Sequence, residues 1–157
     1  MLVTHGGKAK EFDWSYENEW VKIRNVEGKR HEYSLEEFNR ILQLLHDRFG
    51  RGWFPLENNV EKLYNGTEIP GLGQAIYTLS PEKDTTNAQG ASYLGVVLKD
   101  AGLLAWNKKH YGIMWRIIID TVEKDTLRKK FSERSGARRH PDLGGTGTFR
   151  IFRSSET

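Results

Sequence analysis

The chain has 157 residues, of which 37% are hydrophobic and 29% charged, and it contains no cysteine. This length matches one domain and allows a hydrophobic core that needs neither a disulfide nor a metal ion. The lack of cysteine excludes a disulfide framework, thiol catalysis and cysteine-based zinc sites. No segment approaches the ~18 consecutive apolar residues of a membrane-spanning helix, and the first ten residues lack the apolar core of a signal peptide. We therefore expect a soluble, cytoplasmic protein that does not bind membranes.

The net charge of +3 is unevenly distributed along the chain. Residues 1–127 contain 16 Lys and Arg against 18 Asp and Glu, which is a net charge of −2. Residues 128–153 contain eight Lys and Arg against two acidic residues, which is a net charge of +6. A segment with charge of one sign suits a polyanionic partner such as DNA, but it also keeps a tail in solution without binding anything.

The N-terminal residues predict a disordered leader followed by a β-hairpin. Residues 1–12 are largely polar and contain two adjacent glycines, a composition typical of disorder. Val21 and Ile23 alternate with charged residues, as in a half-buried strand. Residues 27–29 can form a turn, after which residues 29–33 pair back as a second strand.

A long amphipathic helix is predicted to follow the hairpin. Ser34 with Glu37 three residues later is typical of a capping box, in which each residue bonds to the backbone N–H of the other. Apolar residues then recur at helical spacing as far as Phe49, and Gly50 can adopt the left-handed conformation that ends a helix. We expect a helix over residues 35–49 that is capped by Ser34.

Two shorter helices are predicted in the middle of the chain. Asn58 with Glu61 three residues later predicts a helix over residues 59–64. Apolar residues at helical spacing predict another over residues 72–79. This second helix ends before Pro81, because proline disfavours helix at the residue that precedes it.

A helix followed by a two-stranded β-ribbon is predicted next. The helix begins near Thr86 and ends at Gly102. Residues 103–106 and 113–119 are rich in apolar side chains and predict two strands, and the polar residues 107–112 predict the turn between them.

The run from Ala91 to Leu104, ASYLGVVLKDAGLL, resembles the third helix of winged-helix proteins with its Gly-Leu stop. In that superfamily a β-ribbon called the wing follows this helix, and the two or three helices predicted ahead of it in this chain match the other half of the fold. The resemblance implies an α+β fold with a winged-helix-like helical core and a C-terminal β-ribbon, to which this chain adds an N-terminal β-hairpin. The added hairpin and the long connection over residues 53–71 depart from the usual plan.

These predictions divide the chain into a disordered leader (residues 1–12), a single winged-helix-like domain (13–119) and a basic C-terminal helix with a flexible tail (120–157). The C-terminal helix is expected to end near Arg134. It contains too few apolar residues for deep burial, namely Val122, Leu127 and Phe131.

DNA contacts are expected from three places, of which the winged-helix resemblance implies the first two and the basic charge of the C-terminal part suggests the third. On the third helix, the side chains expected to face DNA are Thr86, Asn87, Gln89, Ser92, Tyr93 and Lys99. At the wing they are Lys108, Lys109, His110 and Tyr111. In the C-terminal part they are Arg128, Lys129, Lys130, Arg138 and Arg139. Amides and hydroxyls can bond to base edges and cations to phosphates, although each set also suits an ordinary solvated surface.

Five tryptophans are many for this length, and two pairs of aromatic residues yield specific predictions. Trp106 and Trp115 flank the turn of the ribbon and can pair across it. Trp53 and Phe54 lie in a loop, where we expect them to form an exposed patch for contact with another protein.

Nothing in the sequence predicts a catalytic residue, a metal site or a cofactor. The five histidines are scattered and none forms an i, i+4 pair with a second ligand. The glycines of residues 143–148 are not followed by the lysine of a phosphate-binding loop. Asp120 with Glu123 faintly resembles a nuclease cluster, but both lie on a predicted helix rather than on paired strands.

The sequence therefore favours a DNA-binding winged-helix protein, a regulator or an accessory factor of a DNA-processing system, with duplex DNA as its partner. The alternative is a protein-interaction or dimerisation module that contacts no nucleic acid, which the acidic balance of residues 1–127 suits better. An enzyme is less favoured than either.

Overall fold

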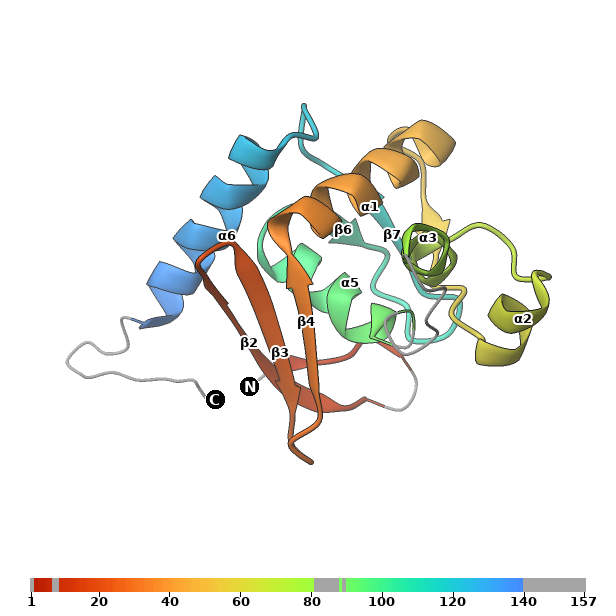
Figure 1. The fold of residues 1–157 in the computed structure, drawn as a ribbon, viewed down its shortest axis with the longest axis horizontal. Coiled ribbons are helices and arrows are strands. Elements are labelled where there is room, and N and C mark those ends of the chain that lie inside the picture. Colours follow the sequence, from red (N-terminus) through yellow and green to blue (C-terminus); the bar gives the residue numbers. More distant parts are fainter. Residues whose placement is uncertain (1, 7–8, 81–87, 89, 140–157) are drawn as a thin grey trace.

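Two antiparallel sheets and five helices make up the part of the chain that the structure describes (Figure 1). The computed structural model describes residues 2–6, 9–80, 88 and 90–139, with side chains as far as residue 135. The strand order is β1-β2-β3-β4 in one sheet and β5-β7-β6 in the other. The expected α+β class is confirmed.

The first sheet consists of β1 (Leu2–Val3), β2 (Glu11–Glu17), β3 (Trp20–Asn25) and β4 (Arg30–Ser34). The predicted hairpin is confirmed as β3 and β4, which pair along their whole length. The prediction of a disordered leader was wrong for the residues described there. β1 pairs with β2, and the Phe12 side chain is fully buried, because it completes an alternating row of inward aromatic residues.

α1 (Leu35–Phe49) begins at the predicted capping box. The Ser34 hydroxyl accepts a hydrogen bond from the backbone N–H of Glu37 at 3.1 Å, and the Glu37 carboxylate accepts one from the N–H of Ser34 at 2.8 Å. The helix ends at Gly50, whose φ of 58° favours glycine. Both predicted ends of this helix are therefore confirmed.

The next elements are β5 (Phe54–Pro55), α2 (Val60–Asn65) and α3 (Leu72–Leu79). The two short helices are confirmed, although α2 is capped by the side chain of Asn59 rather than of Asn58. β5 was not predicted. It pairs with β7 and buries Phe54 completely.

α5 (Ala91–Asp100) is followed by β6 (Leu104–Trp106) and β7 (Met114–Ile117), which confirms the predicted helix and ribbon. Trp106 and Trp115 are partners across the two strands, as expected. The start of the helix expected near Thr86 lies outside the described residues, apart from residues 88 and 90.

Trp115 holds α5 against the second sheet. Its side chain is fully buried, and it lies so close to Gly95 that a Cβ built there would be 2.2 Å from the indole Cζ2. Only a residue without a side chain allows the helix and the strand to approach this closely. Gly95 is therefore required by packing and not by backbone conformation.

α6 (Lys124–Arg139) packs on the first sheet and on α1. Leu127 and Phe131 are both fully buried, so the prediction of shallow burial was wrong. The Phe131 ring lies 5.4 Å from Tyr16 of β2 and 5.0 Å from Phe38 of α1. The few apolar residues of α6 therefore belong to the main core, and α6 is not a separate basic appendage.

The first sheet also covers α5 (Figure 1). The Phe12 and Tyr93 rings meet edge to face at 5.1 Å, and the Trp14 indole N–H donates to the Asp100 carboxylate at 2.9 Å. Seven of the ten residues of α5 are buried. This helix is the centre of the fold.

Replacing Gly95 with alanine is expected to destabilise the protein by about 1–3 kcal/mol, because the new methyl group overpacks against Trp115. At an exposed helix position, glycine to alanine would instead stabilise the protein by roughly 0.5–1 kcal/mol. The sign of the change in unfolding free energy therefore distinguishes a packed Gly95 from an exposed one. Urea unfolding measures the difference. Trp115→Phe removes the ring atoms that conflict with the new methyl group. In a Trp115→Phe protein, Gly95→Ala should therefore lower the free energy of unfolding by less than it does in the wild type. A Gly95→Ala variant as stable as the wild type would contradict this packing.

Candidate nucleic-acid interface

The turn of the ribbon, residues 107–112, is shaped by the Asn107 side chain, and we call it the ribbon tip. The Asn107 Oδ1 atom accepts hydrogen bonds from the backbone N–H groups of Lys109 (3.1 Å) and Met114 (3.2 Å). Its Nδ2 atom donates to the carbonyl of Gly112 at 3.0 Å. Positive φ angles at Lys108 (65°) and Gly112 (70°) complete the turn. The tip therefore has a defined shape.

His5 connects the N-terminal segment to the ribbon. Its ring stacks on Trp106 with centroids 3.7 Å apart and planes 7° apart. The Trp115 indole N–H donates to His5 Nδ1 at 3.3 Å, and the His5 carbonyl accepts a hydrogen bond from His110 Nδ1 at 2.8 Å. These contacts fix the orientation of the ribbon tip relative to the body. Sequence analysis missed His5, because its partners lie about a hundred residues away.

The environment of His5 keeps this ring neutral. Burial, together with the smaller effects of the charges of Lys99 and His110, lowers its pKa to about 4. The neutral form is also the one that the geometry requires, since Nδ1 must keep a lone pair to accept the Trp115 proton.

The ribbon tip presents uncompensated positive charge. Lys108, Lys109 and His110 are exposed, and 83% of the Tyr111 side chain is accessible. Among the described residues, no carboxylate lies within ion-pair distance of either lysine. The exposed Lys99 lies close enough to act on the pKa of His5, so it adds to the same region.

The face of α5 expected to read DNA is not available as a whole. Tyr93 is only 6% exposed, because it packs between Phe12 and His31 of the first sheet, so the prediction that it faces solvent was wrong. Ser92 is half-buried and Lys99 is exposed. The other three predicted residues lie outside the described residues: Thr86, Asn87 and Gln89.

Several cations of α6 are neutralised within the protein. Arg128 contacts Glu19 at 2.7 Å and Asp125 at 2.6 Å, and these carboxylates raise its pKa. Lys129 is exposed and Lys130 half-buried. Arg138 and Arg139 lie in the last turn of α6, and their side chains are outside the described part. The region therefore carries less free charge than its sequence indicates.

The two residues expected to form an exposed patch are separated by the fold. Phe54 points into the core and is fully buried, which contradicts the prediction. Trp53 is 43% exposed, and the Arg116 guanidinium lies 5.3 Å above its ring. The alternation of a strand explains this outcome, because neighbouring residues face opposite sides of a sheet.

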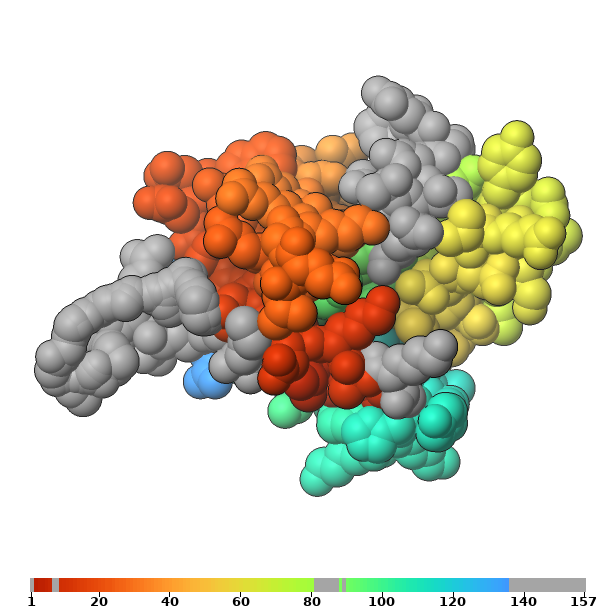
Figure 2. Space-filling model, turned by 90° about the horizontal axis from the view of Figure 1, so that it is seen from below, coloured from red at the N-terminus to blue at the C-terminus, as the bar shows by residue number. Residues whose placement is uncertain are grey.

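A groove of about 510 Å³ opens beside the ribbon. One wall comes from the N-terminal segment and the β3–β4 hairpin, and the opposite wall from residues 56–60 and Ile113. Ser92 and Tyr93 of α5 also line it. Figure 2 shows this face, with the hollow between the red and orange hairpins and the yellow segment, and the ribbon (teal) at its lower edge.

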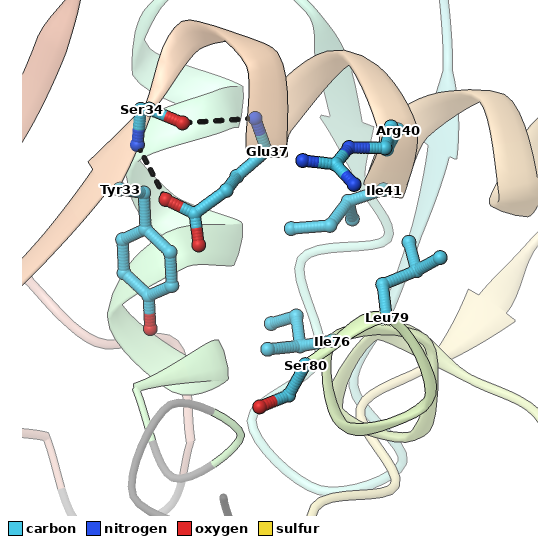
Figure 3. A pocket seen from close by; sticks show the side chains of 8 residues that line it. All are labelled: Tyr33, Ser34, Glu37, Arg40, Ile41, Ile76, Leu79 and Ser80. Carbon is cyan, nitrogen blue, oxygen red and sulfur yellow. Dashed lines mark hydrogen bonds between the residues drawn. The ribbon is translucent and has the colours of Figure 1, made fainter. Parts of the chain in front are cut away.

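A smaller pocket of about 260 Å³ lies between the start of α1 and the end of α3 (Figure 3). Its polar residues already have structural partners. Glu37 is bonded to Ser34 in the capping box, and Arg40 contacts Glu36 at 3.6 Å. Burial and the Glu37 charge raise the pKa of Tyr33, which keeps its hydroxyl protonated. The pocket therefore lacks a free acid, base or nucleophile pair among these residues.

Within the residues that the structure describes, no group of three or more His, Cys, Asp or Glu side chains could hold a metal ion. In the same part of the chain, no helix has the length and apolar character needed to cross a membrane.

Folding stability is expected to fall between pH 6.5 and pH 4, because the unfolded chain protonates His5 at its ordinary pKa of 6.5 and the folded chain only at about 4. The contribution of neutral His5 to the free energy of unfolding is fully present above pH 6.5. It is lost as the pH falls toward 4, and the total loss is at most about 3 kcal/mol. Urea unfolding at pH 7.5 and 4.5 measures it. A His5→Phe variant should be less stable at pH 7.5 but lose less on acidification, with a remainder from His31, whose pKa is also lowered by burial. Equal pH dependence of both proteins would contradict the assignment.

We compared the chain with protein-family models, with curated proteins and with solved structures, and none of them matches it.

Proposed function

We propose that this chain is a DNA-binding protein of winged-helix-like architecture that holds duplex DNA by its phosphates through the ribbon tip. The order of its elements supports the architecture. Four described helices, α1, α2, α3 and α5, precede the β6–β7 ribbon, and α3 packs on both α1 and α5. The short β5 adds a third strand to the ribbon. The N-terminal sheet and α6 are additions around this arrangement.

One observation carries the DNA-binding proposal. Two exposed lysines, Lys108 and Lys109, stand on a turn held in place by Asn107, without a carboxylate in ion-pair distance among the described residues. Lysines that are free and preorganised release condensed counterions when they meet phosphates, which is the main source of affinity for nucleic acid. Among the described residues, five other cations are instead tied to the protein's own carboxylates: Arg40, Arg51, Lys124, Arg128 and Arg134.

Two further cations lie near the ribbon, Lys99 beside the tip and Lys130 at the start of β6. Lys99 acts on the pKa of His5, which is hydrogen-bonded to the tip through His110. The Lys130 ammonium lies near the start of the ribbon, 3.9 Å from where a Cβ at Gly102 would be. With α5 covered by the first sheet, these contacts give affinity for the DNA backbone and little discrimination between base sequences.

Replacing Lys108 and Lys109 together with glutamate should weaken binding to a duplex roughly tenfold or more at low salt and reduce the slope of log affinity against log salt by about 2. Fluorescence anisotropy at several salt concentrations measures both quantities. The matched control is Lys22→Glu with Lys62→Glu, two exposed lysines away from the tip, which should change binding much less. Absent or salt-insensitive binding by the wild type would contradict the proposal.

A second candidate function is interaction with another protein through the outer face of the small sheet. Trp53 and Ile118 are each 43% exposed, and Arg116 covers part of the Trp53 ring. Large apolar side chains left in solvent at this level often mark a contact surface. Because the first sheet covers α5, this helix cannot read base sequence in a major groove, which also favours a protein-interaction module.

Light scattering coupled to size exclusion tests self-association at this face. A truncation after Asp120 cannot be used to test self-association, because it would delete Leu127 and Phe131 from the hydrophobic core. If the face forms a dimer, Trp53→Glu should convert it to a monomer, whereas Tyr64→Glu, a change at another exposed aromatic residue, should not. A wild-type monomer at all concentrations would rule out a homodimer.

A further inference from the structure

We propose that the groove beside the ribbon binds an unpaired nucleotide of a DNA substrate whose duplex phosphates lie on the ribbon tip. This inference rests on the proposed function and deepens it, since it names the form of DNA that the protein prefers. Three features of the groove support it: its chemistry, its size and its position.

The two walls of the groove have complementary chemistry. Leu56, Val60 and Ile113 form an apolar side against which a base can pack. Lys10 and Lys29 line the facing side and can neutralise the phosphate of the same nucleotide. An apolar surface with a few cations and hydroxyls around it is the combination that proteins use for an extruded base.

The polar groups on the lining differ in how far they are free to bind. The Asn25 Oδ1 atom is occupied by the backbone N–H groups of Glu27 and Lys29, at 3.0 and 2.8 Å, so it shapes the rim. Glu27 is the one carboxylate among the described lining residues, against two lysines. His31 is kept largely neutral, because burial and the charge of Lys29 lower its pKa. The groove therefore has a net positive charge that suits a single phosphate.

The size of the groove selects nucleotides over a duplex. A volume of about 510 Å³ lies within the range of small-ligand sites. Ser92 and Tyr93 lie beneath it, and both belong to α5, which cannot move into a major groove because the first sheet packs on it. Ser92, which belongs to the predicted DNA-reading face and is half-buried, would therefore meet the nucleotide inside the groove.

The groove and the ribbon tip lie on opposite sides of the same N-terminal segment. Thr4 and Gly6 line the groove, while the carbonyl of His5 between them accepts the hydrogen bond from His110 of the tip. Figure 2 shows the two regions next to each other on one face of the molecule. A strand that leaves a duplex held at the tip can thus enter the groove directly.

The first test compares a blunt duplex with the same duplex carrying a four-nucleotide single-stranded overhang, by fluorescence anisotropy with the full chain. We expect the overhang to bind about fivefold more tightly or better, because packing one base against a protein surface is enough for that factor. Overhangs on the 3′ and 5′ strands are measured separately.

Two variants locate the effect. Lys10→Gln with Lys29→Gln, and separately Val60→Glu, should remove the preference for the overhang and leave the affinity for the blunt duplex within about twofold. The matched control is Lys22→Gln with Lys62→Gln, which should keep the preference. Circular dichroism and thermal unfolding verify that each variant is folded.

The outcomes separate the two proposals. Equal affinity of the wild type for blunt and overhang DNA would overturn the groove proposal and leave DNA binding at the tip standing. No affinity for either DNA would overturn the proposed function and this inference with it. NMR provides a second measurement: adding a thymidine tetranucleotide should shift the amide signals of Lys29, Val60 and Ser92, and no shift at these residues would overturn the assignment of the groove.

Discussion

The contact between Trp115 and Gly95 is the constraint on which the rest of the fold depends. The indole occupies the space that a side chain at position 95 would need, so the Trp115 ring packs directly on the backbone of α5. The same ring donates its N–H to His5 and is paired with Trp106 across the ribbon. One buried residue therefore joins the central helix, the small sheet and the N-terminal segment.

This arrangement decides which surfaces remain open to a partner. Because the N-terminal sheet packs on α5 through Phe12 and His31, the helix that resembles a recognition helix is a core element. The ribbon is hydrogen-bonded to the N-terminal segment through the His5 carbonyl and His110, and the side chains of its tip remain exposed. The surfaces that we propose for binding are therefore the ribbon tip and the adjoining groove rather than the helix.

The electrostatics follow the same division. Along the sequence, positive charge is concentrated after residue 127, but in the folded protein two of these cations are paired with carboxylates. Arg128 reaches Glu19, more than a hundred residues earlier, and Arg134 reaches Asp100. Lys108 and Lys109 belong to the part of the chain with a net negative charge, yet they have no such carboxylate among the described residues. Local charge is therefore set by folding more than by composition.

The sequence by itself determined the local elements. The capping box of Ser34 and Glu37, the glycine at position 50 and the ribbon with its paired tryptophans all depend on residues a few positions apart, so periodicity and turn chemistry are enough to predict them. β2 could have been predicted in the same way, because Phe12, Trp14 and Tyr16 alternate.

Only the tertiary structure decided which faces are buried. Phe131 packs on Tyr16, and Tyr93 packs on Phe12, across separations of more than eighty residues. A helical pattern reports how apolar one face is relative to another, but not which element will cover it. For that reason the sequence located the ribbon tip, whereas the covered α5, the support from His5 and the groove beside it emerged only when distant segments were packed together.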